Sequence, residues 1–81
     1  MTDEQRDLLL GIVRRVLQRD DVSKDAPLRD AGLDSMALFS LIEGLEETFR
    51  IEVREEEVLP RHFESLRALE TYLAAKLGAG V

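Results

Sequence analysis

The sequence predicts an all-α domain with three longer helices, a short third helix, and a long loop between the first two helices. Three segments repeat apolar residues at steps of three and four positions, the spacing that keeps one face of a helix apolar. Only residues 51–54 alternate like a β-strand, and the chain offers no second run with which they could pair. With 81 residues, 44% of them hydrophobic, and no cysteine, the chain fits one globular domain held by packing rather than disulfides.

The first helix is expected over about residues 3–18. Thr2 or Asp3 can cap its acidic first turn, and arginines stand near its end, as the helix dipole favours. The apolar positions of this helix are Leu8, Leu9, Ile12, Val13, Val16 and Leu17.

Residues 19–34 are expected to form a loop, because the helical periodicity stops and Asp, Ser, Lys, Pro27 and Gly32 dominate. A loop of this length is unusual in so small a domain, and such loops are commonly functional. Spaced apolar residues could pin it across the core: Val22, Ala26, Leu28, Ala31 and Leu33.

The second helix is expected over about residues 35–50. Its core-facing stripe is expected to be Met36, Phe39, Ile42, Leu45 and Phe49, widened by Leu38 and Leu41. Gly44 inside this helix costs roughly 1 kcal/mol relative to alanine. A glycine at this position can mark a close approach by another helix.

The residues after position 50 are expected to form a connector and then one short helix. Ile51 and Val53 of the connector 51–54 are expected to plug the core. Residues 55–59 can form one helical turn, acidic at its start, which Pro60 then ends.

The last helix is expected over about residues 65–77, capped by Ser65 and stopped by Gly78. Its apolar positions are Leu66, Leu69, Tyr72, Leu73 and Leu77. The larger side chains expected in the core, some of which could line a cavity, are Phe39, Ile42, Phe49, Phe63 and Tyr72.

The net charge of −6 is concentrated in one part of the chain. Residues 20–57 hold 12 acids and four bases, a net charge of −8, so the remainder is +2. Such a balance disfavours nucleic acid as a partner and favours proteins with basic patches. The charged N-terminus lacks the apolar run of a secretory signal, and no stretch reaches the ~18 apolar residues of a membrane span. We therefore expect a cytoplasmic protein with no membrane partner.

Free-standing catalysis is not expected, because the usual catalytic groups are missing or isolated. His62 is the only imidazole, and it stands beside a proline turn with no cysteine to pair with. The chain has no glycine-rich phosphate loop, no calcium loop and no sulfur ligands for zinc. We predict neither catalytic nor metal-ligating residues, and a surface or half-buried His62.

The segment Gly32-Leu33-Asp34-Ser35-Met36 joins the long loop to the second helix. Gly32 permits a tight turn, Asp34 can cap the helix, and Ser35 then occupies the first helical position. There its hydroxyl is exposed beside free N–H groups at the positive end of the helix dipole, a setting that suits a covalently attached phosphate. The same residues are also those of an ordinary helix start.

With this segment in its context, nearly the whole chain resembles the acyl and peptidyl carrier proteins. These four-helix bundles carry a G-x-D-S-[L/M] motif at the start of the second helix, matched here by Gly32, Asp34, Ser35 and Met36. The resemblance extends to the acidic second helix, the connector from Phe49 to Val53, and the start of the last helix at residues 63–66.

The resemblance implies that Ser35 carries 4′-phosphopantetheine, whose thiol holds an acyl or aminoacyl group as a thioester. A phosphopantetheinyl transferase would install the arm from coenzyme A, with magnesium held mainly by the enzyme and coenzyme and Asp34 as an aid. Expected later partners are acyl or aminoacyl ligases, ketosynthases or condensation-type enzymes, and tailoring enzymes. The residues expected to meet such partners are Met36, Glu43, Glu46 and Glu47. The carrier is expected to be a non-catalytic monomer.

Two departures from the fatty acid carriers bear on the pathway. Acids often occupy two early positions of their second helix, where this chain has Ala37 and Ser40. The turn at residues 59–66 also resembles carriers of specialised metabolism. We therefore expect polyketide, nonribosomal peptide or related biosynthesis, with fatty acid synthesis as the alternative.

A different class of function also stays open. The chain could be a small helical protein-interaction module with an unmodified Ser35. A phosphorylation switch at Ser35 ranks below it, because no basic kinase consensus immediately precedes the serine.

Overall fold

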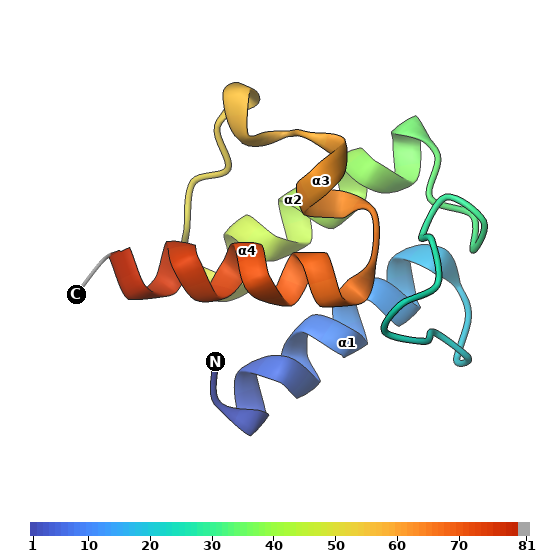
Figure 1. The fold of residues 1–81 in the computed structure, drawn as a ribbon, viewed down its shortest axis with the longest axis horizontal. Helices are drawn as coiled ribbons and strands as arrows, with labels where there is room; N and C mark the ends of the chain where they lie inside the picture. Colours follow the sequence, from blue (N-terminus) through green and yellow to red (C-terminus); the bar gives the residue numbers. More distant parts are fainter. Residues whose placement is uncertain (80–81) are drawn as a thin grey trace.

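The computed structural model describes residues 1–79 of the chain (Figure 1). Its elements are α1 (Asp3–Leu17), α2 (Ser35–Phe49), a 3-10 turn (Glu55–Glu57), α3 (Pro60–Phe63) and α4 (Leu66–Ala79). Within residues 1–79 there is no β-strand, so the all-α prediction is confirmed. Helix α1 packs mainly on α2, and α3 packs on α4, which crosses the middle of the molecule (Figure 1). No helix in this part of the chain is both long and apolar enough to span a bilayer.

Helix α1 begins with a capping box. The Thr2 hydroxyl accepts a hydrogen bond from the Gln5 N–H at 3.1 Å, and the Gln5 side chain accepts one from the Thr2 N–H at 2.9 Å. These two bonds satisfy N–H groups that the helix leaves without partners. The helix buries Leu9, Ile12 and Val13.

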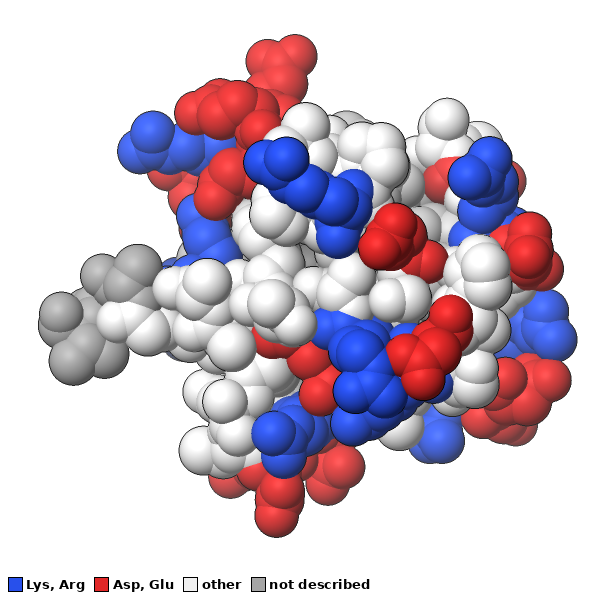
Figure 2. Space-filling model, viewed as in Figure 1, with Lys and Arg blue, Asp and Glu red and all other residues white. Residues whose placement is uncertain are grey.

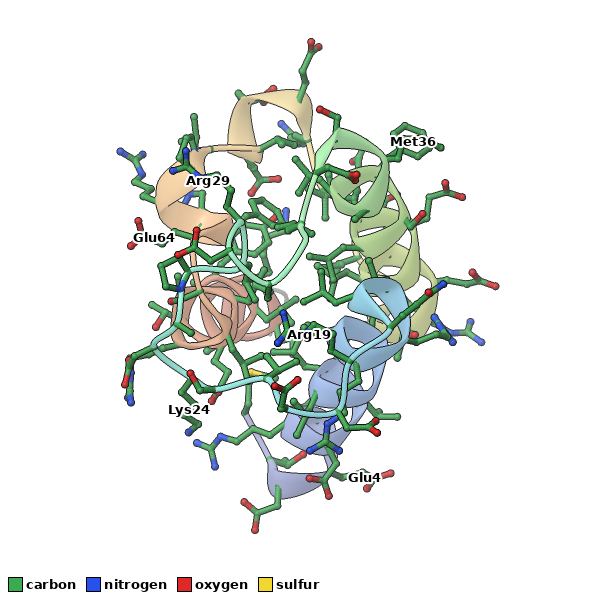
Figure 3. All side chains as sticks on the ribbon, turned by 90° about the vertical axis from the view of Figure 1, so that its right-hand side faces the viewer. Glu4, Arg19, Lys24, Arg29, Met36 and Glu64 are labelled. Carbon is green, nitrogen blue, oxygen red and sulfur yellow. The ribbon has the colours of Figure 1, made fainter. Side chains whose placement is uncertain are left out.

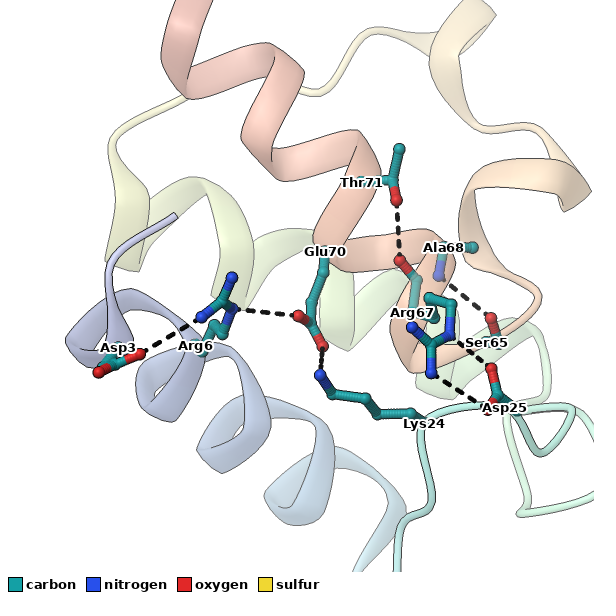
Figure 4. Close-up of polar contacts among 9 residues, drawn as sticks. All are labelled: Asp3, Arg6, Lys24, Asp25, Ser65, Arg67, Ala68, Glu70 and Thr71. Carbon is teal, nitrogen blue, oxygen red and sulfur yellow. Dashed lines mark hydrogen bonds and ion pairs between the residues drawn. The ribbon is translucent and has the colours of Figure 1, made fainter.

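The long loop is held down at the junction of α3 and α4. Leu28 is 1% exposed, and its N–H donates to the Glu64 carbonyl at 2.9 Å. The Arg67 N–H donates to the Lys24 carbonyl at 3.0 Å, and the Arg67 guanidinium pairs with Asp25 at 2.6 Å (Figure 4). This guanidinium lowers the pKa of the Asp25 carboxyl. The loop is therefore a fixed part of the fold, although Ala26, expected to face inward, is exposed.

The predicted core stripe of α2 is wrong at its first two positions. Met36 is 81% exposed and Phe39 is 67% exposed. Each step of three residues falls about 60° short of a full helical turn, so a series of such steps drifts around the helix. The face that packs inward instead carries Leu41, Gly44 and Leu45, with the half-buried Leu38, Ile42 and Phe49.

Gly44 lies where α1 and α2 approach closely. A Cβ atom at this position would lie 3.0 Å from Cγ2 of Ile12 and 3.6 Å from Nη2 of Arg15. By contrast, a Cβ atom at Gly11, also within a helix, would meet nothing within 4 Å. The close approach suggested by the helical glycine is confirmed.

These two glycines should respond in opposite ways to larger side chains. We expect Gly11→Ala to raise the free energy of unfolding by about 0.5–1 kcal/mol, because alanine favours helix and the site is open. Gly44→Leu should lower it by roughly 2 kcal/mol, because the side chain has no room against α1. Urea unfolding measures both values, and equal stabilisation by the two substitutions would contradict the close contact at Gly44.

The chain between α2 and α4 differs from the prediction around Pro60. Residues 55–59 do not form an α-turn; Glu55–Glu57 form a 3-10 turn. Pro60 begins α3 rather than only ending the preceding turn. Proline suits the first helical position because its φ is preset. An N–H group at this position would have no acceptor within the helix, so proline loses nothing by lacking one. The residue before it, Leu59, is extended as expected.

Helix α4 completes the core. The Ser65 hydroxyl accepts from the Ala68 N–H at 3.1 Å, so it caps the helix as the sequence predicts. Gly78 does not stop the helix, which continues to Ala79. A single glycine near a helix end costs little enough for the backbone hydrogen bonds to continue through it. The fully buried side chains come from α1, α2, α4 and the loop: Leu9, Val13, Leu28, Leu41, Leu45, Leu69 and Leu73.

Candidate functional site

Ser35 stands at the first position of α2, where the loop ends. Gly32 has a φ of 108°, a backbone conformation that favours glycine, and it forms the turn before the helix. Asp34 is the N-cap, and its carboxylate accepts from the Ala37 N–H at 2.8 Å. Gly32 and Asp34 thus have the local roles that the sequence predicts, and they leave the Ser35 side chain exposed to solvent.

The start of α2 offers an electrostatic setting for a negatively charged group. The intrahelical bonds of α2 begin with the Leu38 N–H, which donates to the Asp34 carbonyl at 2.8 Å. The N–H groups of Ser35 and Met36 precede this ladder and stand at the positive end of the helix dipole. A phosphate bonded to the Ser35 oxygen would lie beside these groups.

Two large apolar side chains are exposed next to Ser35. Met36 lies on the outer side of α2, away from the body of the molecule (Figure 3). Phe39, one turn later on the helix, is also exposed, although the sequence places it in the core. The pattern Leu38, Leu41 and Leu45 on one face could have shown that Phe39 points outward. Exposed apolar side chains beside a reactive group are typical of protein-docking surfaces.

The three predicted partner-binding glutamates differ in their exposure to solvent. Glu43 and Glu47 are exposed, whereas Glu46 is half-buried and its carboxylate accepts from the Val53 N–H at 3.0 Å. Glu46 therefore holds the connector against α2. Acidic and basic side chains are intermixed over the face of the molecule seen in Figure 2.

An open groove starts at Ser35 and continues between the loop, α3 and α4. Its apolar lining includes Leu33, Leu38, Phe63 and Tyr72. Three arginines also line it, one each from the loop, α3 and α4: Arg29, Arg61 and Arg67. Figure 3 shows Arg29 on the same side of the molecule as α3 and Glu64. The groove gives an extended group attached to Ser35 an apolar surface on which to lie.

Tyr72, at the bottom of this groove, is a buried packing residue. Its hydroxyl has no hydrogen-bond partner among the described residues. Burial, with Glu57 and Glu46 as lesser causes, raises the pKa of the Tyr72 phenol to about 12. The half-buried His62 ring lies 4.9 Å from the Tyr72 ring, centroid to centroid, so His62 also packs in the fold.

The residues of this site could present a group rather than transform one. Within residues 1–79, no hydrogen bond joins the Ser35 hydroxyl to a base, and no cluster of three or more acids and histidines could hold a metal ion. The arrangement offers an exposed alcohol, an anion-favouring helix end and an apolar surface beside it.

Comparison with known proteins shows the family. Residues 7–73 match the family model described as "Phosphopantetheine attachment site". Aminoacyl carrier protein 2 of Bradyrhizobium diazoefficiens is 34% identical over 76 residues, which cover 89% of this chain and 85% of the relative. Aminoacyl carrier protein 1 of the same organism is 30% identical over 76 residues, covering 89% of this chain and 84% of the relative.

Solved structures of Bradyrhizobium japonicum glycine:[carrier protein] ligase with carrier proteins are similar in fold. One chain of the complex between the ligase, its cognate carrier protein and an analogue of glycyl adenylate matches this chain with a TM-score of 0.71 and 30% identity. The match covers 89% of this chain and 94% of the chain in the complex. One chain of the complex with glycylated carrier protein matches with a TM-score of 0.66 and 32% identity. This match covers 84% of this chain and 92% of the chain in the complex. The chain therefore belongs to the phosphopantetheine-attachment family of carrier proteins, which hold acyl or aminoacyl groups as thioesters on a 4′-phosphopantetheine arm.

Proposed function

We propose that Ser35 is the serine that carries 4′-phosphopantetheine, and that the chain is a non-catalytic cytoplasmic carrier of aminoacyl groups. The observation that carries this assignment is the exposure of Ser35 at the first position of α2, where Asp34 caps the helix. When attached, the arm supplies a thiol to a chain that has no cysteine.

The residues present fit the arm. The Ser35 oxygen would form the phosphodiester, and the N–H groups of Ser35 and Met36 would favour its negative charge. Asp34 would hold the helix start in place and stay available to the magnesium of the transferase. The groove from Leu33 to Tyr72 offers the rest of the arm an apolar surface.

An aminoacyl group is the proposed cargo because of the relatives' names. The two curated relatives are aminoacyl carrier proteins, and the carrier proteins in the two solved structures are bound to a glycine:[carrier protein] ligase. An aminoacyl ligase is therefore the proposed loading partner, and condensation-type or tailoring enzymes of specialised biosynthesis would act afterwards. The uncharged Ala37 and Ser40 make fatty acid synthesis the weaker alternative.

The enzymes that act on the arm are proposed to contact the exposed side of α2. Met36 is the residue next to the attachment point, and Phe39 extends the same apolar surface. Glu43 and Glu47 are free to meet such enzymes, because both are exposed. Glu46 contributes through the fold, so charge reversal at Glu46 would disturb the connector as well as any contact.

The test is covalent modification followed by mass spectrometry. Incubation with coenzyme A and a broad-specificity phosphopantetheinyl transferase should add one phosphopantetheine to the wild-type protein and none to Ser35→Ala. Ser23→Ala is the matched control, because Ser23 is also exposed and lies in the loop before the site. This variant should be modified like the wild type.

Two results would count against the proposal. Absence of a mass gain in the wild type would favour the unmodified interaction module, whose partners would bind equally well before and after the transferase reaction. An equal gain in Ser35→Ala would place the arm on another residue.

A further inference from the structure

The first turns of α4 hold the long loop at two adjacent residues, Lys24 and Asp25. The Arg67 guanidinium makes two bonds to the Asp25 carboxylate, at 2.6 Å from Nε and 3.2 Å from Nη2 (Figure 4). The backbone N–H of the same arginine donates to the Lys24 carbonyl at 3.0 Å, and the Lys24 ammonium pairs with Glu70 at 3.6 Å. We call the pair of Asp25 and Arg67, which are 42 positions apart in the chain, the loop clamp.

Arg67 stands where its own helix disfavours a positive charge. It is the second residue of α4, near the positive end of the helix dipole, and the first turn of this helix, residues 66–69, contains no acid. An arginine at this position therefore gains from a negative partner outside the helix. The Asp25 carboxylate is that partner, and the two-bond geometry makes such a pair stronger than most ion pairs on a protein surface.

A short series of backbone hydrogen bonds continues from the clamp to Ser35. Three residues after the aspartate of the clamp, the Leu28 N–H donates to the Glu64 carbonyl at 2.9 Å. The Leu28 carbonyl accepts from the Ala31 and Leu33 N–H groups, each at 3.0 Å, which closes the turn directly before α2. Because each bond spans only a few residues, a shift of the loop at the clamp would change the turn that leads into Ser35.

The loop contains a second arginine–aspartate pair that does not reach another element. Arg19 donates two bonds to Asp21, each at 3.1 Å, and the two residues are only two positions apart. The side chains of Asp21 and Asp25 are equally exposed, at 74% and 75%. The two pairs are therefore alike in chemistry and exposure, and they differ in that only the clamp joins the loop to a helix.

We propose that the loop clamp positions Ser35 for modification, by holding the loop on α4 so that the turn before α2 keeps one conformation. The inference rests on the proposed attachment of phosphopantetheine to Ser35. In that reaction the serine oxygen forms a bond to the phosphorus nearest the pantetheine, the pyrophosphate bond of coenzyme A breaks, and the nucleotide and the serine proton leave. Asp25 and Arg67 act through the backbone of residues 28–33, so their loss would misplace the serine oxygen without removing a contact with the enzyme.

The first measurement is amide hydrogen exchange in the unmodified protein, followed by NMR. The variants are Asp25→Asn and, as the matched control, Asp21→Asn, because each removes one charge from an exposed loop pair at nearly constant size. We expect the Ala31 and Leu33 amides to exchange about three-fold or more faster in Asp25→Asn. In Asp21→Asn their exchange should change by less than about 1.5-fold, because opening of the turn leaves that pair intact.

The second measurement is the transferase reaction at a temperature where all variants are folded. Asp25→Asn should lower kcat about three-fold or more and leave KM within about two-fold, whereas Asp21→Asn should leave both values within about 1.5-fold. A contribution to global stability alone would not change kcat under these conditions. The charge swap Asp25→Arg with Arg67→Asp should restore kcat, because it recreates the pair and places an acid at the start of α4.

Three results would overturn the proposal: equal exchange of the loop amides in the two asparagine variants, equal kcat values for them, or a charge swap that is as slow as Asp25→Asn. Failure of the proposed function is distinguishable from each of these. The wild-type protein would then gain no mass in the transferase assay, whereas the exchange comparison uses unmodified protein and decides separately whether the clamp holds the turn.

Discussion

Leu28→Ala is expected to lower the free energy of unfolding by about 3 kcal/mol, a large part of the stability of so small a domain. Leu28 is the one fully buried side chain that the loop contributes to the described core. Its carbonyl also accepts from the Ala31 and Leu33 N–H groups, each at 3.0 Å, so it organises the turn before the site. The substitution would leave a cavity between the loop and the helices.

Val22→Ala is the control for this prediction, since Val22 belongs to the same loop but is only half-buried. Its cost should stay at or below about 1 kcal/mol. Urea unfolding followed by circular dichroism measures both variants, and the midpoint should shift while the slope stays the same. A similar cost for the two substitutions would mean that Leu28 does not anchor the loop.

The features that the sequence predicted best depend on residues close to one another in the chain. Thr2, Asp34 and Ser65 each cap a helix through a backbone N–H three residues later. Gly32 adopts a positive φ within a turn of only a few residues. Because these interactions are local, residue type and spacing were sufficient to predict the start of α2 and the environment of Ser35.

The features that the sequence does not predict depend on how the helices pack and on which way their residues face. Phe39 fits an apolar series at steps of three, but α2 packs on α1 through its other side, where Leu41 and Leu45 are buried. In the sequence, Glu46 resembles the other acids of the second helix. Its hydrogen bond with the Val53 N–H forms only when the connector turns back on α2. The sequence predicts that Pro60 ends a helical turn, but proline is equally suited to the first helical position, where Pro60 begins α3.

The charge of a segment likewise does not give the charge of a surface. Residues 20–57 sum to −8, yet the exposed acids of α2 are only Glu43 and Glu47. Docking should therefore depend more on the apolar side chains of this helix than on its acids.

Met36→Ser combined with Phe39→Ser should raise the KM of the transferase reaction by about ten-fold or more, because two large apolar contacts beside Ser35 would be lost. The same double variant should unfold at the wild-type urea concentration or above, because both side chains are exposed in the free protein. A higher KM in the transferase reaction without a lower free energy of unfolding is the result expected of a docking surface.

Leu8→Ser is the matched control, since among the described residues Leu8 is the third exposed large apolar residue and it lies on α1, not on α2. Its KM should stay within about two-fold of the wild type, because a single exposed apolar residue away from the contact contributes little to binding. If the double variant reacted like Leu8→Ser, Met36 and Phe39 would not be docking residues. If it lost stability instead, the two side chains would belong to the core, as the periodicity of the sequence first predicted.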